Sequence, residues 1–200
     1  EAGWLKFARQ GKVLFVAKRT FMHTVSWDHL YQRGIVYGTN DNGKHPRGTP
    51  ANQYTVVEHG GNRFIVRLLT GANADPYPES DPLFFTDDMP QMNIGGSSEW
   101  NDLIYRVHTD VPTDDGTDGQ ALDRHGGPQV GANWAAMTND DLNIGTGDGR
   151  FCWTQEMSDS NSSTRAFRGL DNLAYFRRDA ASSANSAYGW RPCLELVPNF

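Results

Sequence analysis

The amino-acid sequence predicts an α+β fold with short antiparallel strands, two short helices and long loops. Runs of β-branched and aromatic residues are short and are separated by turn residues, which is typical of antiparallel hairpins. Two segments carry the strongest helical signals, and no alternation of strands with helices indicates a doubly wound parallel sheet. The 21 Gly and 10 Pro residues predict many turns. We expect one domain over residues 1–200, because this is an ordinary domain length.

Two hairpins are predicted in the first half of the chain. Residues 4–7 and 12–17 are β-rich, and Gly11 between them can adopt the positive φ that a tight turn requires. Residues 54–58 and 63–69 form a similar pair of runs around a Gly-Gly-Asn turn. Both pairs are therefore expected to be antiparallel.

Two helices are predicted from capping residues and from spacing. The first covers about residues 26–33, where Ser26 is a suitable N-cap and Gly34 a suitable C-cap. The second covers residues 99–107, with Ser97 or Ser98 as its N-cap, and has apolar residues at i, i+3, i+4 and i+7. These apolar residues are Trp100, Leu103, Ile104 and Val107.

Polar segments without periodicity separate these elements and predict loops over residues 38–51, 71–96 and 109–131. Thr138 resembles a helix cap, because it precedes two aspartates and a leucine. β-rich runs in the last third of the chain predict further strands. These strands are expected over residues 150–155, 165–168, 173–176 and 190–197.

The charge balance and hydropathy exclude two classes of partner. The chain has 18 Lys and Arg against 24 Asp and Glu, a formal charge of −6, and no basic block that would neutralise a phosphate backbone. No run approaches the roughly 18 apolar residues that a membrane span needs. We therefore expect neither nucleic-acid binding nor membrane insertion.

The sequence shows no catalytic constellation. A nucleophile elbow is missing, and the glycine-rich residues 145–149 lack the Lys-Ser/Thr of a phosphate-binding loop. Glu99, Glu156 and Glu195 are the best candidates for the carboxylates of a glycosidase. The alternative is structural: Glu99 lies in a first helical turn, and the other two can pair with arginines on neighbouring strands. The structural interpretation is favoured, so no enzymatic activity is predicted.

One acidic loop is a candidate calcium site. Asp110, Asp114, Asp115, Asp118 and Asp123 cluster with glycines, a composition that suits a hard cation with oxygen ligands. The spacing is not that of an EF-hand. A solvated acidic loop without an ion has the same composition, so both interpretations stay open.

The chain contains two cysteines, Cys152 and Cys193, in aromatic segments predicted as strands. A disulfide between neighbouring strands would close a loop of about 40 residues and contribute ~3 to 4 kcal/mol in the chain-entropy model. The alternative is a pair of buried thiols that act as small hydrophobic groups. The sequence leaves both alternatives open.

Two segments near the C-terminus, residues 163–170 and 188–196, have the sequences STRAFRGL and YGWRPCLEL. They resemble the closing pattern of C-type-lectin-like folds of the formylglycine-generating-enzyme and phage-variable-protein type. The resemblance implies an Arg-x-x-Arg-Gly strand, a loop and a terminal strand. The paired cysteines of the oxidase members are missing, so formylglycine-generating activity is not implied. Residues 100–102 contain the Trp-Asn-Asp string of animal lectins without its Glu-Pro-Asn partner, and no sugar-calcium site is transferred.

Earlier segments resemble domains of phage tail fibres and other virion structural proteins. These segments are residues 3–7, 16–18, 26–27, 36–38, 66–73, 98–101, 141–142 and 151–156, together with Trp134. Their order spans nearly the whole chain. The resemblance implies a virion protein, a fibre tip or a capsid decoration, and it leaves open that the chain is a fragment of a longer fibre protein.

The resemblance also implies a binding function. A rigid aromatic core that carries variable loops is a common arrangement for recognition, and in lectin-like phage proteins the ligand face comes from the C-terminal loops. The corresponding residues are Asn172, Tyr175, Arg177, Arg178, Asn185 and Tyr188. The implied partners are other virion proteins and a host-surface glycan or protein, with a homo-oligomer as a further option. A virion-associated carbohydrate-active hydrolase and a bacterial surface lectin are the alternatives.

Overall fold

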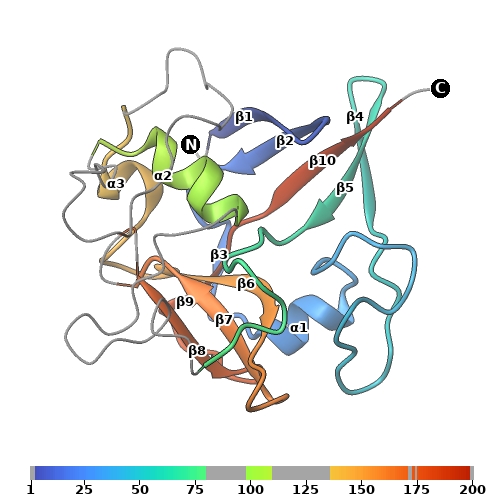
Figure 1. Cartoon of the computed structure of the whole chain (residues 1–200). Coiled ribbons are helices and arrows are strands. Elements are labelled where there is room, and N and C mark those ends of the chain that lie inside the picture. Colours follow the sequence, from blue (N-terminus) through green and yellow to red (C-terminus); the bar gives the residue numbers. More distant parts are fainter. Residues whose placement is uncertain (1–2, 80–97, 110–135, 171–172, 174, 199–200) are drawn as a thin grey trace.

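The computed structural model describes residues 3–79, 98–109, 136–170, 173 and 175–198 (Figure 1). Two five-stranded sheets and a few short helices make up this part of the chain. The predicted mixture of helices and mainly antiparallel strands is therefore confirmed. Among the described helices, none is long and apolar enough to cross a bilayer.

The first sheet contains both predicted hairpins. Its strands are, in spatial order, β1 (Trp4–Arg9), β2 (Lys12–Ala17), β10 (Cys193–Val197), β5 (Asn62–Arg67) and β4 (Val56–His59). All its pairs are antiparallel. The glycine at position 11 has φ +76°, as the turn requires. The last strand, β10, lies between the two hairpins and joins them into one sheet (Figure 1).

The second sheet comes mainly from the C-terminal third of the chain. Its strands are, in spatial order, β3 (Met22–His23), β9 (Tyr188–Trp190), β6 (Phe151–Met157), β7 (Thr164–Arg168) and β8 (Phe176–Ala180). The β6–β9 pair is parallel, an exception to the predicted antiparallel pattern. The strand predicted over residues 173–176 is wrong, because β8 only begins at Phe176 and continues along β7 to pair Ala180 with Thr164.

The predicted strand over residues 190–197 is in fact two strands in different sheets. β9 ends at Trp190 and β10 begins at Cys193, so the chain changes sheets at Arg191 and Pro192. Pro192 has no N–H to donate to a ladder, which favours the break. Arg191 is 1% exposed and donates to the carbonyls of residues 17, 18 and 142. Its guanidinium therefore fastens the crossing point.

The first predicted helix is confirmed as α1 (Trp27–Gln32). Ser26 Oγ accepts a hydrogen bond from the backbone N–H of His29 at 3.1 Å. Gly34 follows the helix with φ +69°. Trp27 is buried, and its indole N–H donates to the carbonyl of Thr154 at 3.0 Å, so the helix is fixed to β6.

The second predicted helix is less regular than its spacing indicates. It consists of a π-helical turn, η1 (Trp100–Ile104), followed by one α-helical turn, α2 (Tyr105–Val107). Its four predicted core residues are all buried. The wider turn accompanies burial of a polar residue, Asn101, which accepts a hydrogen bond from Arg168. Thr138 caps α3 (Asn139–Leu142) in a reciprocal capping box, as its position predicts.

Two apolar clusters hold the sheets and helices together. The first joins the inner face of β1 and β2 to η1 and α2, through residues such as Phe7, Leu14 and Trp100. The second surrounds α1 and packs it against β6, β7 and β9, through Trp153 and Phe167 among others. The segment that follows α1 therefore begins at a helix that is packed into an aromatic cluster.

Candidate functional site

The predicted C-terminal ligand face includes one residue that belongs to the core. Tyr188 is 3% exposed, and its ring stacks on that of Trp153 with 4.7 Å between the centroids. Its hydroxyl donates to Asp179. The prediction that Tyr188 binds a ligand is therefore wrong, because β9 carries this side chain into the aromatic cluster around α1.

Three other residues of that face are accessible. Arg177 and Asn185 are exposed, and Tyr175 is half-buried. Arg177 Nη1 and the Tyr175 hydroxyl oxygen are 3.5 Å apart. The side-chain oxygen of Asn185 accepts from the backbone N–H of Ala187, which is a turn contact. These residues form no described pocket.

Arg178 adds little to the predicted face, and Asn172 is not described. Arg178 Nη1 forms an ion pair with Glu79 Oε2 at 2.8 Å, so its charge is already matched inside the chain. Asn172 lies outside the described residues. The prediction about Asn172 therefore stays a prediction.

The aspartates of the predicted calcium loop, Asp110, Asp114, Asp115, Asp118 and Asp123, also lie outside the described residues. The part of the chain that the structure describes contains no group of His, Cys, Asp and Glu residues that would hold a metal ion. The calcium hypothesis therefore stays a prediction about residues 110–123.

Both cysteines are buried and free. Cys152 lies on β6 and Cys193 on β10, and these strands belong to different sheets. The structure thus agrees with the interpretation of two thiols in the core rather than with a disulfide. Burial raises the pKa of Cys193 to about 12, so its thiol stays protonated.

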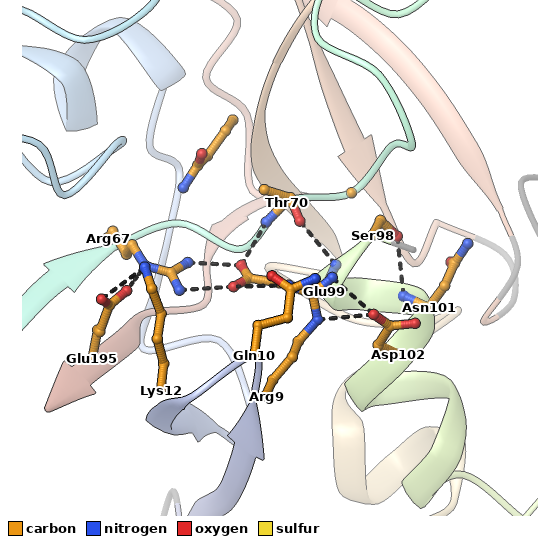
Figure 2. Close-up of polar contacts among 12 residues, drawn as sticks. Arg9, Gln10, Lys12, Arg67, Thr70, Ser98, Glu99, Asn101, Asp102 and Glu195 are labelled. Carbon is orange, nitrogen blue, oxygen red and sulfur yellow. Dashed lines mark hydrogen bonds and ion pairs between the residues drawn. The ribbon is translucent and has the colours of Figure 1, made fainter. Parts of the chain in front are cut away.

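Two of the three candidate catalytic carboxylates are structural (Figure 2). Glu99 receives both terminal nitrogens of Arg67 at 2.7 Å, and Arg67 Nε reaches Glu195 at 3.0 Å. Burial is the largest single influence on Glu99 and opposes its ionisation, but the charge and hydrogen bonds of Arg67, the N–H of Thr70 and the charge of Arg9 together outweigh it and lower the pKa of Glu99. Glu195 also pairs with Lys12 at 2.8 Å. The predicted pairing of Glu195 with an arginine on a neighbouring strand is confirmed. Glu99, whose structural role was expected from its place in the first helical turn, is held instead by its ion pair with the same arginine.

The third candidate, Glu156, is sealed in the interior. It is 1% exposed, and its Oε1 accepts from the backbone N–H of Gly71 at 2.8 Å. Its Oε2 has no hydrogen-bond partner among the described residues, so the predicted pairing with an arginine is not found. Burial raises the pKa of Glu156 to about 7. This pKa would suit a general acid, but the side chain does not line a described pocket.

An open pocket of about 420 Å³ lies at the segment that follows α1. Most of its wall comes from the loop of residues 38–55, and the remainder comes from Tyr37 just before this loop, from the segment that follows β5 and from β6. Figure 1 shows this loop, in light blue to cyan, beside α1. The lining residues are Tyr37, Thr39, Asp41, Gly43, Lys44, Asp75 and Gln155.

The 38–55 loop has no regular secondary structure but is fixed by hydrogen bonds. Gln53 is fully buried; its side chain accepts from the N–H of Val36 and donates to the carbonyls of Tyr31 and Ala51. The Tyr31 hydroxyl donates to the carbonyl of Asn42 at 2.9 Å. α1 therefore supplies the contacts that set the shape of the loop.

Asp75 joins this loop to the second sheet. Its Oδ1 lies 2.8 Å from His45 Nε2 and accepts from the backbone N–H of Met157 at 3.1 Å. Lys44 Nζ donates to the carbonyl oxygen of Asp75 and lies 3.8 Å from its Oδ2. The Lys44 cation is thus already matched by Asp75.

Asp41 is held by a turn of its own loop. Its Oδ1 accepts from Thr39 Oγ1 at 2.6 Å and from the backbone N–H of Gly43 at 2.8 Å. These hydrogen bonds lower the pKa of Asp41, which is therefore ionised at neutral pH. Gly43 has φ +75°, and a Cβ there would lie 2.1 Å from the ring of Tyr37, so the close approach requires glycine.

Tyr37 supplies an aromatic wall. It is 8% exposed, and its hydroxyl has no hydrogen-bond partner among the described residues. Burial raises the pKa of this hydroxyl above its ordinary value, so it is a neutral donor at physiological pH. The pocket therefore combines an aromatic ring, two carboxylates, an ammonium group and an amide.

The sequence predicted the loop but not the pocket. Residues 38–51 were expected to form an exposed loop, and no regular element interrupts them. The Asp41-Asn42-Gly43 triplet is a signal for the observed turn, because aspartate binds the backbone two residues on and glycine supplies positive φ. The contribution of Asp75 and Gln155 depends on tertiary contacts and has no local signal.

Comparisons with protein-family models, with curated proteins and with solved structures give no match for this chain. The candidate site therefore rests on its own geometry.

Proposed function

We propose that this chain is a phage virion adhesion domain with a C-type-lectin-like fold, and that it binds a host-surface glycan through the pocket of the 38–55 loop. The resemblance of residues 163–170 and 188–196 to the closing segments of that fold supports the fold assignment. The central place of β10 in the first sheet agrees with a terminal strand that completes the domain. The role is that of a fibre tip or of a capsid decoration protein.

The observation that carries the proposal is the ordered 38–55 loop. Long loops without secondary structure are uncommon in compact domains and are usually functional. Here a fully buried glutamine and the side chains of α1 hold the loop in one shape. A loop that is stiff before its ligand arrives loses little conformational entropy on binding. This arrangement suits recognition.

The pocket has the chemistry that sugar hydroxyl groups require. Asp41 and Asp75 offer carboxylate oxygens that accept hydrogen bonds, whereas Lys44 offers an ammonium that donates them. Tyr37 adds an apolar wall for the C–H face of a pyranose ring. An open, half-polar pocket of this size holds one or two sugar units and leaves the rest of a glycan in solvent.

Binding explains this site better than hydrolysis does. A two-carboxylate glycosidase needs one acid with a raised pKa beside a second, ionised carboxylate. The pKa of Asp41 is lowered, so it does not supply that acid. Glu156 has the raised pKa but does not line the pocket. Asp41 and Glu156 therefore do not form the acid-base pair that the hydrolase alternative requires.

A microarray of bacterial surface polysaccharides tests the binding function. We expect the purified chain to bind at least one glycan, and Lys44→Ala to weaken that binding by about fivefold to tenfold, because a charge-assisted hydrogen bond is lost. Lys6→Ala, at an exposed position on β1, is the matched control and should bind like the parent. No bound glycan, or equal binding by the Lys44 and Lys6 variants, would contradict the proposal.

The virion location needs a separate test. Gold-labelled antibodies against the chain should decorate particles of the phage or prophage that encodes it. Label at the tip of a fibre indicates the receptor-binding role, and label on a regular capsid lattice indicates decoration. Particles that carry no label, while the protein stays in the soluble fraction of the lysate, would favour the surface-lectin or other non-virion interpretations.

A further inference from the structure

The charges in the pocket are not balanced. Asp41 and Asp75 contribute two carboxylates, and Lys44 is the one cation among the lining residues. Lys44 is committed to Asp75, since its ammonium reaches both the backbone carbonyl and Oδ2 of that residue. Asp75 also has His45 at 2.8 Å. The surplus negative charge therefore lies on Asp41.

Asp41 is held in one orientation, but only one of its two carboxylate oxygens accepts hydrogen bonds from the described residues. Its Oδ1 takes both of its hydrogen bonds, from Thr39 and from Gly43, whereas its Oδ2 accepts none from a described residue. Within the described part of the chain, no cation lies within ion-pair distance of this carboxylate. A carboxylate with one fixed and one open oxygen is prepared to receive a positively charged donor.

Tyr37 forms the wall beside this carboxylate. Its side chain is more than nine-tenths buried and lines the pocket, and its ring lies against Gly43, whose backbone N–H holds Asp41. The hydroxyl oxygen of Tyr37 is enclosed in the wall. The pocket thus offers one open anionic acceptor, Asp41 Oδ2, beside an aromatic ring.

We propose that the pocket selects sugars that carry a free, protonated amine, and that Asp41 Oδ2 receives that ammonium group. This inference rests on the proposed glycan-binding function and names the class of sugar. Neutral sugars would bind through the same hydroxyl contacts but without the charge contact. Uronic and other acidic sugars would be disfavoured, because Asp41 repels a carboxylate and Lys44 is already engaged by Asp75.

Three tetrasaccharides separate charge from shape. The β-1,4-linked tetramers of glucosamine, N-acetylglucosamine and glucose share one backbone and differ in the group at C2: ammonium, acetamide or hydroxyl. Titration calorimetry is done in low salt, at a pH at which the glucosamine amine is protonated. We expect the glucosamine tetramer to bind about fivefold more tightly than the glucose tetramer, the gain from one exposed ion pair of ~1 kcal/mol.

Asp41→Asn is the decisive variant. It keeps Oδ1 as the acceptor for Thr39 and Gly43 but removes the charge, so the loop should keep its shape. We expect the ratio of the affinities for the glucosamine and glucose tetramers to fall from about fivefold to about one, whatever the variant does to the affinity for glucose. Asp148→Asn, at an exposed position outside the pocket, should retain the preference. Thermal unfolding of both variants checks that the fold is intact.

The outcomes separate this inference from the function on which it rests. Equal affinity for the three tetramers, with weaker binding by Lys44→Ala, would overturn amine selection and support glycan binding. A preference that survives in Asp41→Asn would show that the amine binds elsewhere and would also overturn the inference. If none of the tetramers binds, amine selection is contradicted, and the polysaccharide array alone then decides whether glycan binding stands.

Discussion

The network around Glu99 and the pocket around Asp41 both contain carboxylates and cations, but Glu99 and Asp41 differ in how many partners their oxygens have. Glu99 is buried, receives a bidentate contact from Arg67 and accepts from the N–H of Thr70, so neither oxygen is open (Figure 2). Asp41 is exposed and has one open oxygen. A saturated carboxylate holds elements together, whereas an open one is available to a ligand.

The difference also explains why residue type alone is a poor guide to function. Glu99 and Glu195 were candidates for catalysis because each follows or precedes apolar residues. Both form ion pairs with one arginine of β5, Arg67. The pocket instead uses one aspartate in the 38–55 loop and one in the segment that follows β5. What distinguishes the two regions is the partner of each oxygen, which only the folded chain shows.

Arg67→Met should produce the largest loss of stability. The substitution leaves Glu99 buried without its partner, which typically costs about 3 to 5 kcal/mol of unfolding free energy. Urea denaturation measures the loss. Lys12→Met is the matched control in the same network, because Lys12 is largely exposed and its pair with Glu195 should contribute less than about 1 kcal/mol. Similar losses in the two variants would contradict the assignment of Arg67 as the centre of the network.

Glu156→Gln should stabilise the chain at high pH. Burial raises the folded-state pKa of Glu156 from 4.5 to about 7, so the folded chain holds this proton more tightly than the unfolded chain. Stability therefore falls as pH rises from about 4.5 to 7 and is level above that. Glutamine cannot ionise and escapes this loss.

The expected gain of Glu156→Gln above pH 7 is about 3 kcal/mol, and near pH 4 the two proteins should be equally stable. Urea denaturation at both pH values checks this. A variant that is less stable than the parent at high pH would show that the ionised carboxylate is favourable in the core. In that case the ionised form of Glu156 is stabilised by a partner in the folded chain, and Glu156 would not be an example of a buried carboxylate without one.

Two glycines with the same backbone angle test the pocket wall. Gly43 and Gly61 both have φ +75°, but a Cβ at Gly43 would meet the ring of Tyr37, whereas a Cβ at Gly61 meets nothing within 4 Å. Gly43→Ala should cost about 2 kcal/mol or more and abolish glycan binding; Gly61→Ala should cost about 1 kcal/mol from strain alone. Thermal melts and the glycan array measure both effects. Equal losses of stability and of binding in the two variants would mean that the loop can rearrange around the added Cβ and that its shape is not fixed.

The smallest effect is expected at the C-terminal face. Arg177→Ala should leave both stability and glycan binding within about 0.5 kcal/mol of the parent, because Arg177 is exposed and lines no described pocket. The same calorimetric titration that tests the pocket measures this. A strong loss of binding would support the C-terminal ligand face that the resemblance implies and would contradict a binding site at the 38–55 loop.

Local signals accounted for much of the fold. The two N-terminal hairpins, α1 with its Ser26 cap and the helix cap at Thr138 all depend on residues close in sequence, and all are confirmed. The burial of Trp100, Leu103, Ile104 and Val107 also follows from their spacing, whereas the burial of Asn101 and Arg106 beside them does not.

Features that depend on distant partners could not be predicted. The change of sheet at Arg191 requires carbonyls from residues 17, 18 and 142, and the burial of Tyr188 requires Trp153. The pocket has the same origin. Its loop was predicted, but Asp75 and Gln155 reach it only because β6 packs beside α1. The resemblance named the residues of a C-terminal ligand face, but it could not show which of their side chains are buried in the core, as Tyr188 is.

Amide chemical-shift mapping by NMR, with a glycan that the array identifies, tests the central claim most directly. We predict that the shifts concentrate at residues 37–44, at Asp75 and at Gln155, and that the amides of residues 175–185 stay unchanged. Shifts confined to residues 175–185, with the 38–55 loop silent, would place the ligand on the opposite candidate face and contradict the account.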